Sequence, residues 1–427
     1  MKTIGLDIGT TTICGVLMDG SKVLRMIRAK NSYGLPPSEQ LPCERLQDAE
    51  GIVEVVKRLY EDLYEPDVEA VGLSGQMHGI VYVDENGGSV SPVYTWQDGR
   101  GDLPCSGGLS YAEILSHDKK TRLSTGFGEV TYFYNTLNGF VPASAVSFCA
   151  IADLCAMALT GRKKPLTHIS HLASFGGALS EFSPEMTKTA AIVGETAQGV
   201  PVICSIGDNQ ASYICALGSG GEGSVVLLNL GTGGQISYAT KPYRAADDYP
   251  AGVELRPLDG DKFIAVGSSI CGGRALAIWE GFLRDVVKLA VPGYTGNLFE
   301  AIDKAALTGG GDIKFDTRFS GSRIMPGARG AISGLSEDNF TPQAVSAALF
   351  RGIAEELYGL WDCESENTLL IGSGNAMRRN PAMRAAAEWV FGMPLILSPY
   401  EEESAAGAAI YAQNSGIILR THTETAS

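Results

Sequence analysis

Positive charge is scarce in this chain of 427 residues: 33 Lys and Arg stand against 48 Asp and Glu, a formal net charge of −15. Surfaces that bind nucleic acid or an anionic membrane need clustered Lys and Arg, so the composition argues against both kinds of partner. The longest basic run, Arg162 to Lys164, lies between Gly161 and Pro165 and is typical of a solvated turn. A nucleotide site stays open, because a few backbone N–H groups can hold phosphate even in an acidic protein.

Patterns typical of disulfide frameworks, membrane spans and secretion are also missing. The nine cysteines are scattered, odd in number and form no C-x-x-C pair, which favours reduced thiols. No apolar stretch approaches the ~18 residues that a membrane helix needs. Met1-Lys2-Thr3 leads directly into an apolar strand pattern, so we expect no secretory signal and a cytoplasmic protein. His168 and His171 are spaced like a metal pair but have no third ligand nearby in sequence, which disfavours a metal site there. The oligomeric state stays open, with a homodimer among the options.

The common nucleotide-binding motifs are absent: there is no G-x-x-x-x-G-K-[ST], and no G-x-G-x-x-G opens a helix after the first strand. Two hairpins are the candidates for phosphate binding instead. Apolar strands at 3–8 and 13–18 flank one turn, and strands at 225–230 and 235–238 flank the other. The candidate phosphate-contacting residues in these turns are Gly9, Thr10, Thr11, Thr12, Gly231, Thr232 and Gly233.

The two hairpins share a shape, which suggests an internal repeat of two related halves. Small turn residues let the main chain approach a triphosphate, and successive N–H groups form a nest for it. A single such turn is more often a plain β-turn. Two of them, one in each half, favour the actin-like ATPase architecture, in which a loop from each domain grips ATP across a cleft. We expect the domain boundary near residue 200.

Strands and helices alternate along the rest of the chain, which predicts α/β layers with a core sheet in each half. Thr341 is a plausible N-cap for one of these helices. Strands are expected at 70–74, 80–83, 202–206 and 368–371, and helices at 147–159, 274–288, 342–360, from Pro381 and at 401–413.

Two carboxylates stand at the ends of apolar strands. Asp7 lies inside a strand just before the first turn, and because a buried unpaired carboxylate is costly we expect it to have a partner. It either holds water on Mg²⁺ at the ATP phosphates or caps its own turn. Asp208 follows a strand and is either a general base for phosphoryl transfer or the N-cap of the next helix.

Polar and aromatic residues suited to a polyol gather at two places. The carboxylate, amide, guanidinium and imidazole groups can pair with hydroxyls, while Trp packs on C–H faces. For the second place, a core Trp with a surface Asp–Arg pair stays an alternative. The loop after strand 368–371 could support adenine or be an ordinary connection. The candidate sugar-binding residues are Gln76, Met77, His78, Trp96, Asp98, Arg100, Asn209 and Gln210, and the candidate adenosine loop is Gly372, Ser373, Gly374 and Asn375.

Together these motifs resemble, in order and over nearly the whole chain, the FGGY family of carbohydrate kinases, above all its sedoheptulokinase branch. Gly5–Thr11 is similar to the family's first phosphate loop, Ser74–Gly79 to its sugar loop and Thr95–Arg100 to the form found in that branch. Ser124–Gly128 and Ala173–Gly176 are also similar to that branch. The resemblance implies two ribonuclease-H-like domains with an ATP and sugar cleft between them, an N-terminal sugar-binding domain at 1–200 and a C-terminal nucleotide-binding domain at 201–427. It also implies Mg·ATP as cofactor and Asp208 as catalytic base.

Two positions depart from the sedoheptulokinase branch: Gly231-Thr232-Gly233 replaces S-T-S, and Asn209 is more typical of xylulokinases. We therefore expect phosphorylation of a ketose at its terminal primary hydroxyl, with sedoheptulose first and D-xylulose as the alternative. A rival from another class is an actin-like ATP-dependent switch module with no small acceptor. The polar clusters at 76–79 and 96–100 disfavour that rival, because such a module needs no polyol pocket.

Overall fold

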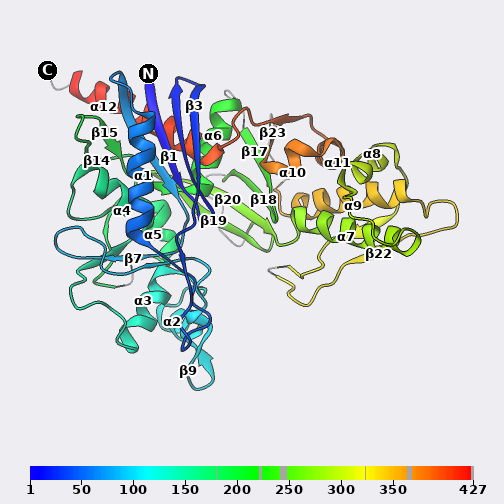
Figure 1. Ribbon diagram of the computed structural model, residues 1–427, viewed down its shortest axis with the longest axis horizontal. Coiled ribbons are helices and arrows are strands. Elements are labelled where there is room, and N and C mark those ends of the chain that lie inside the picture. Colours follow the sequence, from blue (N-terminus) through cyan, green and yellow to red (C-terminus); the bar gives the residue numbers. More distant parts are fainter. Residues whose placement is uncertain (179, 221–223, 241–247, 323, 363–367, 425–427) are drawn as a thin grey trace. The chain divides into compact units, whose positions relative to one another are not determined.

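The computed structural model describes residues 1–427 except 179, 221–223, 241–247, 323, 363–367 and 425–427 (Figure 1). The chain divides into two compact units. Unit 1 contains residues 1–218, 257–262 and 402–427, and unit 2 contains 219–256 and 263–401. The boundary was expected near residue 200, which lies inside unit 1, and the chain returns to unit 1 twice in its second half.

Unit 1 is built on a seven-stranded sheet with the order β14-β15-β6-β1-β2-β3, and β16 also pairs with β6. The predicted first hairpin is confirmed, because β1 and β2 pair antiparallel up to Ile8 opposite Ile13. Both β1 and β16 run parallel to β6. The strands are β1 (Lys2–Ile8), β2 (Thr12–Asp19), β3 (Lys22–Lys30), β6 (Val68–Gly75), β14 (Ile192–Glu195), β15 (Pro201–Ile203) and β16 (Ile206–Gly207).

Unit 2 repeats this plan in the order β19-β20-β18-β17-β23-β24. Its second hairpin pairs β17 with β18, and β17 runs parallel to β23 as β1 does to β6. The internal repeat inferred from the two Gly-Thr turns is therefore confirmed at the level of sheet topology. The strands are β17 (Ser224–Leu230), β18 (Gly234–Ala239), β19 (Val253–Asp259), β20 (Lys262–Ser269), β23 (Thr368–Ser373) and β24 (Leu395–Leu397).

The Ala-rich helix α12 (Glu403–Glu424) packs against β1 and β6 in unit 1. Glycines make this close approach possible: a Cβ at Gly5 would lie 1.9 Å from the carbonyl oxygen of Ala405, and one at Gly72 would lie 2.0 Å from that of Ala408. The other helices of unit 1 are α1 (Ala49–Leu63), α2 (Tyr111–Lys119), α3 (Gly128–Leu137), α4 (Ile151–Thr160), α5 (Ile169–Phe175) and α6 (Asp208–Gly220), with the 3-10 helix η1 (Arg100–Asp102).

In unit 2 the central helix α9 (Pro342–Tyr358) contributes eleven buried residues to the core. Thr341 caps it as predicted, because its hydroxyl accepts the backbone N–H of Ala344 at 3.2 Å. The remaining helices are α7 (Gly272–Ala290), α8 (Phe299–Thr308), α10 (Gly374–Arg379) and α11 (Pro381–Phe391). Within the described ranges, no helix is both long enough and apolar enough to cross a bilayer.

Two segments differ from the predictions. Residues 147–149 were expected to begin a helix but form strand β11 (Ser147–Cys149), which pairs with β7 (Val81–Val83) before α4 starts at Ile151. The strand expected at 202–206 is interrupted at Cys204-Ser205, because Ser205 donates its hydroxyl to the buried carboxylate of Asp153 at 2.5 Å. Both differences come from partners far away in sequence, which local periodicity does not report.

Short strands complete the two units. They are β4 (Gly34–Leu35), β5 (Leu46–Gln47), β8 (Val93–Tyr94), β9 (Pro104–Ser106), β10 (Leu109–Ser110), β12 (Leu166–His168), β13 (Glu185–Thr187), β21 (Lys314–Asp316) and β22 (Ala331–Ser333).

Candidate active site

Strand register brings three predicted loops to one edge of the sheet in unit 1. Gly75 of β6 lies opposite Ile8 of β1 on one side and opposite Gly207 of β16 on the other. All three strands are parallel, so the residues that follow them emerge at the same carboxyl edge. Ligands bind outside this edge in open α/β sheets. The residues that follow the strands form three segments. From the sequence, Gly9–Thr12 is assigned to phosphate binding and Gln76–Gly79 to sugar binding, and Asp208–Gln210 contains the candidate base.

Thr10 joins the first phosphate loop to the sugar loop. Its hydroxyl donates to the Oε1 of Gln76 at 3.1 Å and accepts from the Nε1 of Trp96 at 3.0 Å. Gln47, buried on β5, completes the ring: its Nε2 donates to the Thr10 carbonyl, and its Oε1 accepts from Gln76, both at 2.8 Å. Trp96 remains 47% exposed, so its side chain is accessible to a ligand.

Asp7 lies among other acids. Its Oδ1 accepts the hydroxyl of Ser74 at 2.8 Å, so its described hydrogen bond comes from β6 and not from its own turn. Burial, together with the nearby charges of Asp208 and Glu402, raises the pKa of Asp7 to about 7. A cation at this edge would relieve the repulsion between the carboxylates.

The residues fit a magnesium ion held largely through water. Among the described residues, no three His, Cys, Asp or Glu side chains form a preassembled metal site. Mg²⁺ does not require one in phosphoryl transfer, because it keeps several waters and binds through one or two carboxylates together with the substrate phosphates. Asp7 provides a carboxylate of that kind at this edge.

Asp208 is half-buried at the first position of α6, immediately after β16. Its Oδ1 accepts the next backbone N–H, that of Asn209, at 2.8 Å, so the carboxylate also helps to start the helix. Asn209 is half-buried beside it. Gln210 is fully buried and donates its Nε2 to the carbonyl of Pro257, which holds its side chain inside unit 1.

The sugar loop has an unusual backbone at His78. This residue has a φ of 71°, the left-handed region that few non-glycine residues adopt. Its ring stacks on Phe127 with centroids 4.6 Å apart, and its Nδ1 donates to the carbonyl of Ser174 at 2.8 Å. Met77 is buried beside it, against Gly207.

Asp98 and Arg100 pair with each other, as one of the two alternatives had it, but the pair is buried and not at the surface. Their relative exposures are 0% and 1%, and the guanidinium contacts both carboxylate oxygens, at 2.6 and 3.2 Å. Arg100 also donates to Asn135 and lies over the ring of Tyr94. Backbone N–H groups of Arg45 and Arg100 occupy the carboxylate further. In this structure the pair supports the loop that presents Trp96.

Unit 2 contains a cavity of about 1020 Å³ at the carboxyl end of its parallel strands. Gly231, Thr232 and Asn375, three of the predicted nucleotide residues, line it. The N-terminus of α7 closes onto the Gly-Thr turn, since Gly273 N–H donates to the Gly231 carbonyl at 3.0 Å and Arg274 N–H to that of Thr232 at 2.9 Å. Further lining comes from Arg274, Phe299, Asp303, Lys304, Arg379 and Asn380.

The remaining predicted nucleotide residues of unit 2, Gly233 and Gly372–Gly374, do not line this cavity. Gly372 and Ser373 are buried on β23, and the hydroxyl of Ser373 has no partner within the described structure. Gly374 has a φ of 82°, and a Cβ there would lie 2.5 Å from the Leu230 carbonyl oxygen. Gly233 packs against the start of α7, where a Cβ on Gly272 would lie 2.5 Å from its carbonyl carbon.

The predictions from sequence missed three residues of the site. Gln47 completes the Thr10 ring, Glu402 lies close enough to Asp7 to raise its pKa, and Ser404 contacts both β6 and α6. The Ser404 carbonyl accepts from Ser74, while its hydroxyl meets that of Ser212 at 2.9 Å and donates to the Asp208 carbonyl at 3.3 Å. The sequence shows acidic residues just before the alanines of α12, but it does not indicate that they lie close to Asp7.

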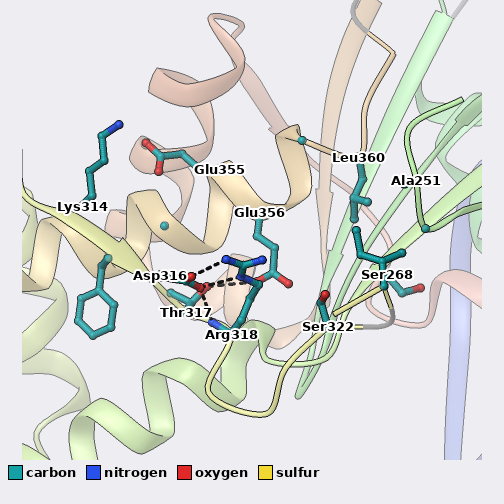
Figure 2. Close-up of a pocket in the computed structure, with 15 residues that line it drawn as sticks. Ala251, Ser268, Lys314, Asp316, Thr317, Arg318, Ser322, Glu355, Glu356 and Leu360 are labelled. Atoms are coloured by element: carbon teal, nitrogen blue, oxygen red, sulfur yellow. Dashed lines mark hydrogen bonds and ion pairs between the residues drawn. The ribbon is translucent and has the colours of Figure 1, made fainter. Parts of the chain in front are cut away.

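A second cavity in unit 2, of about 420 Å³, contains none of the predicted site residues. Figure 2 shows Arg318 bonded to Asp316, with Glu356, Ser322 and Ser268 around the same space. Burial raises the pKa of Glu356, although hydrogen bonds from Ser269 and Thr317 oppose this. We assign the candidate site to the strand edges and not to this cavity, because none of the predicted loops reaches it.

Comparison with known proteins supports the fold described above. The fold is shared with two-domain actin-like sugar kinases of known structure: a xylulose kinase from Rhodospirillum rubrum (TM-score 0.79, 19% identity, 97% of this chain and 90% of that chain) and a gluconate kinase from Lactobacillus acidophilus (TM-score 0.78, 17% identity, 98% and 89%). Over 98% of both chains, the sequence is 25% identical to sedoheptulokinase of Homo sapiens, and it is 22% identical to a xylulose kinase of Staphylococcus epidermidis over 96% of this chain and 87% of the other.

A more specific match covers the N-terminal part of the chain. Residues 2–133 match the N-terminal domain of the FGGY family of carbohydrate kinases. This segment contains the Gly9–Thr12, Gln76–Gly79 and Thr95–Arg100 motifs, and the resemblance drawn from the motifs is confirmed.

Replacing Gly273 by Ala should weaken nucleotide binding. A Cβ at this position would lie 2.3 Å from the Gly231 carbonyl oxygen, so the turn that lines the large cavity must move. We expect ATP affinity measured by calorimetry to fall about tenfold, the equivalent of roughly 1.4 kcal/mol. Gly281→Ala on the same helix is the matched control, since a Cβ there meets nothing within 4 Å. Equal affinities for the two variants would remove the turn from the nucleotide site.

Asp7→Asn should raise the melting temperature of the ligand-free protein at alkaline but not at acidic pH. The folded-state pKa of Asp7 is raised to about 7, so ionisation costs folding free energy that appears as pH rises from about 4 to 7 and stays constant above. Asn is uncharged and can still accept from Ser74. The difference between variant and parent should be near zero at pH 4 and about 2–4 °C for each kcal/mol recovered at pH 8.

Scanning fluorimetry across pH 4–8, without nucleotide or metal, measures this difference. Asp338→Asn, at an exposed position, controls for the loss of one negative charge. A difference that does not change with pH would mean that the Asp7 carboxylate is not buried at a cost.

Proposed function

We propose that this protein transfers the γ-phosphoryl group of ATP to the terminal primary hydroxyl of a ketose, with sedoheptulose preferred and D-xylulose as the alternative. The observation that carries the proposal is the strand register that places Asp208 beside both the Gly9–Thr12 turn and the Gln76–Gly79 loop. An acid at that point can serve an acceptor hydroxyl held by one loop and a phosphate held by the other.

In this mechanism Asp208 accepts the proton of the attacking hydroxyl as the oxygen approaches phosphorus. A base positioned within hydrogen-bond reach of the hydroxyl contributes in this way to phosphoryl transfer. The backbone N–H groups of the Gly9–Thr12 turn hold phosphate oxygens without adding charge. Burial and its acidic neighbours raise the pKa of Asp7. A counter-cation bound at this edge would relieve the repulsion between these carboxylates.

ATP with Mg²⁺ is the proposed cofactor. The cavity of unit 2 has a volume suited to a nucleotide, and Gly231, Thr232 and Asn375 line it. Asp7, with Asp208 nearby, would hold Mg²⁺ through water, and the ion would offset the charge of the phosphates. A Plasmodium falciparum glycerol kinase of similar fold (TM-score 0.70) has been solved with ADP.

Contacts to the sugar are proposed for the residues that reach the surface of the site. Trp96 is 47% exposed, His78 and Asn209 are half-buried, and Gln76 is fixed by Thr10 and Gln47. The bond from Nδ1 of His78 to the Ser174 carbonyl sets the orientation of the imidazole ring. Asp98 and Arg100 act behind this surface by holding the Trp96 loop.

The preference for sedoheptulose rests on the Thr95–Arg100 motif and on the sedoheptulokinases of mouse and human, which align with almost the whole chain at 24% and 25% identity. A xylulose kinase of Staphylococcus epidermidis also aligns with almost the whole chain, at 22% identity. The rival function, an ATP-dependent switch without an acceptor, would hydrolyse ATP equally well with and without sugar.

A coupled kinase assay over C5 to C7 ketoses tests the function. We expect ATP turnover to depend on a ketose, and kcat/KM for sedoheptulose to exceed that for D-xylulose by at least about tenfold. Sedoheptulose has two more hydroxyls than D-xylulose. Where these hydroxyls hydrogen-bond to the site, the shorter sugar leaves their polar partners unpaired, at a cost of about 1–3 kcal/mol each. A preference for xylulose would overturn the choice of sugar alone, and turnover independent of any sugar would favour the switch.

Asp208→Ala should leave ATP binding nearly unchanged and lower kcat by roughly 10²–10⁴-fold, the usual contribution of a positioned general base. Calorimetry with ATP and steady-state kinetics measure the two effects separately. Asp338→Ala, at an exposed position outside the site, is the control. A variant with near-normal kcat would exclude Asp208 as the base.

A further inference from the structure

Helix α5 (Ile169–Phe175) carries two buried serines one turn apart, at 170 and 174. Residues four apart lie on the same face of a helix. Each hydroxyl accepts a backbone N–H from a different part of the candidate site, both at 3.0 Å: Ser170 from Gly207 at the end of β16, and Ser174 from His78 in the loop after β6. One short helix thus holds the segment that carries the proposed base and the loop of the proposed sugar contacts.

The hydrogens around Ser170 can be assigned from its neighbours. Nε2 of His168 faces the carbonyl of Lys188 at 3.2 Å and must therefore donate to it. Nδ1 is then an acceptor, so Ser170 donates its hydroxyl hydrogen to Nδ1 at 2.9 Å and keeps its lone pairs for Gly207. This chain fixes the residue directly before Asp208.

Ser174 acts on the strained residue of the sugar loop. The N–H of His78 donates to the Ser174 hydroxyl, and the His78 ring donates to the Ser174 carbonyl, so both parts of His78 are bound to one residue. The Ser174 hydroxyl in turn donates to the His171 carbonyl at 2.8 Å. These bonds account for the stability of a φ of 71° at a non-glycine position.

We propose that α5 sets the separation of base and substrate, with Ser170 as a positioning residue for Asp208 and Ser174 as a positioning residue for His78. This rests on the proposed function, since it assigns the two loops to proton transfer and sugar binding. Neither serine touches a reacting atom. Small displacements of a positioned group are sufficient to slow a reaction strongly, because catalysis depends on orientation.

The proposal predicts different kinetic effects for two serines on the same helix. Ser170→Ala should lower kcat about tenfold with KM for the ketose changed less than twofold. Ser174→Ala should raise that KM about fivefold to tenfold with kcat within about twofold. Ser170→Cys and Ser174→Cys keep the size with a weaker acceptor and should fall between each Ala variant and the parent. They provide a folded comparison if an Ala variant is unstable.

Ser91→Ala is a matched control. The Ser91 hydroxyl also accepts a backbone N–H, from Tyr82, at 3.0 Å and donates to a carbonyl, that of Pro92, at 2.8 Å. It should lose similar stability without the kinetic effects. If both Ala variants behave like Ser91→Ala, or both change kcat and KM together, the positioning roles are overturned.

Amide hydrogen exchange gives a readout that does not depend on turnover. Ser170→Ala should speed exchange in a peptide covering residues 206–210 and leave 76–80 unchanged, and Ser174→Ala should do the reverse. Unchanged exchange in both would overturn the proposal even in an active enzyme. Absence of ketose phosphorylation by the parent, with these exchange effects present, would overturn the proposed function and leave α5 as the element that holds the two loops.

Discussion

Parallel pairing of β6 with both β1 and β16 is the constraint on which the candidate site depends. Because Gly75 lies level with Ile8 and Gly207, three loops from distant parts of the chain emerge at one edge. A one-residue slip in either pairing would turn the side chains of that strand to the opposite face of the sheet. The close packing of α12 on Gly5 and Gly72 resists such a slip, since backbone atoms of the helix occupy the space where Cβ atoms would lie.

The same packing has an electrostatic consequence. By bringing the start of α12 to the sheet, it places Glu402 and Ser404 near Asp7 and Asp208. Burial and the charges of the two neighbouring acids raise the pKa of Asp7 to about 7, so the ligand-free protein can relieve the repulsion by binding a proton there near neutral pH. A site that binds a divalent cation together with a polyanion is expected to contain carboxylates that repel one another before the cation binds.

Around this edge, polar side chains form continuous chains of hydrogen bonds. Thr10 connects Gln76, Trp96 and Gln47, while α5 connects the loops at His78 and Gly207. Such networks fix orientation because breaking any one bond leaves a buried group unpaired. The Asp98–Arg100 pair follows the same logic at the base of the Trp96 loop.

Sequence by itself determined the two Gly-Thr hairpins, the repeat they imply and the helix capped by Thr341, and it selected Asp7 and Asp208 as candidates for the site. These are local signals, carried by strand periodicity, turn residues and a carboxylate in an apolar run. Tertiary structure alone decided that residues 147–149 form a strand, that Arg100 is buried on Asp98, and that Gln47, Glu402, Ser170 and Ser174 belong to the site. Burial and hydrogen-bond partners depend on segments far apart in sequence, so no window of local sequence contains them.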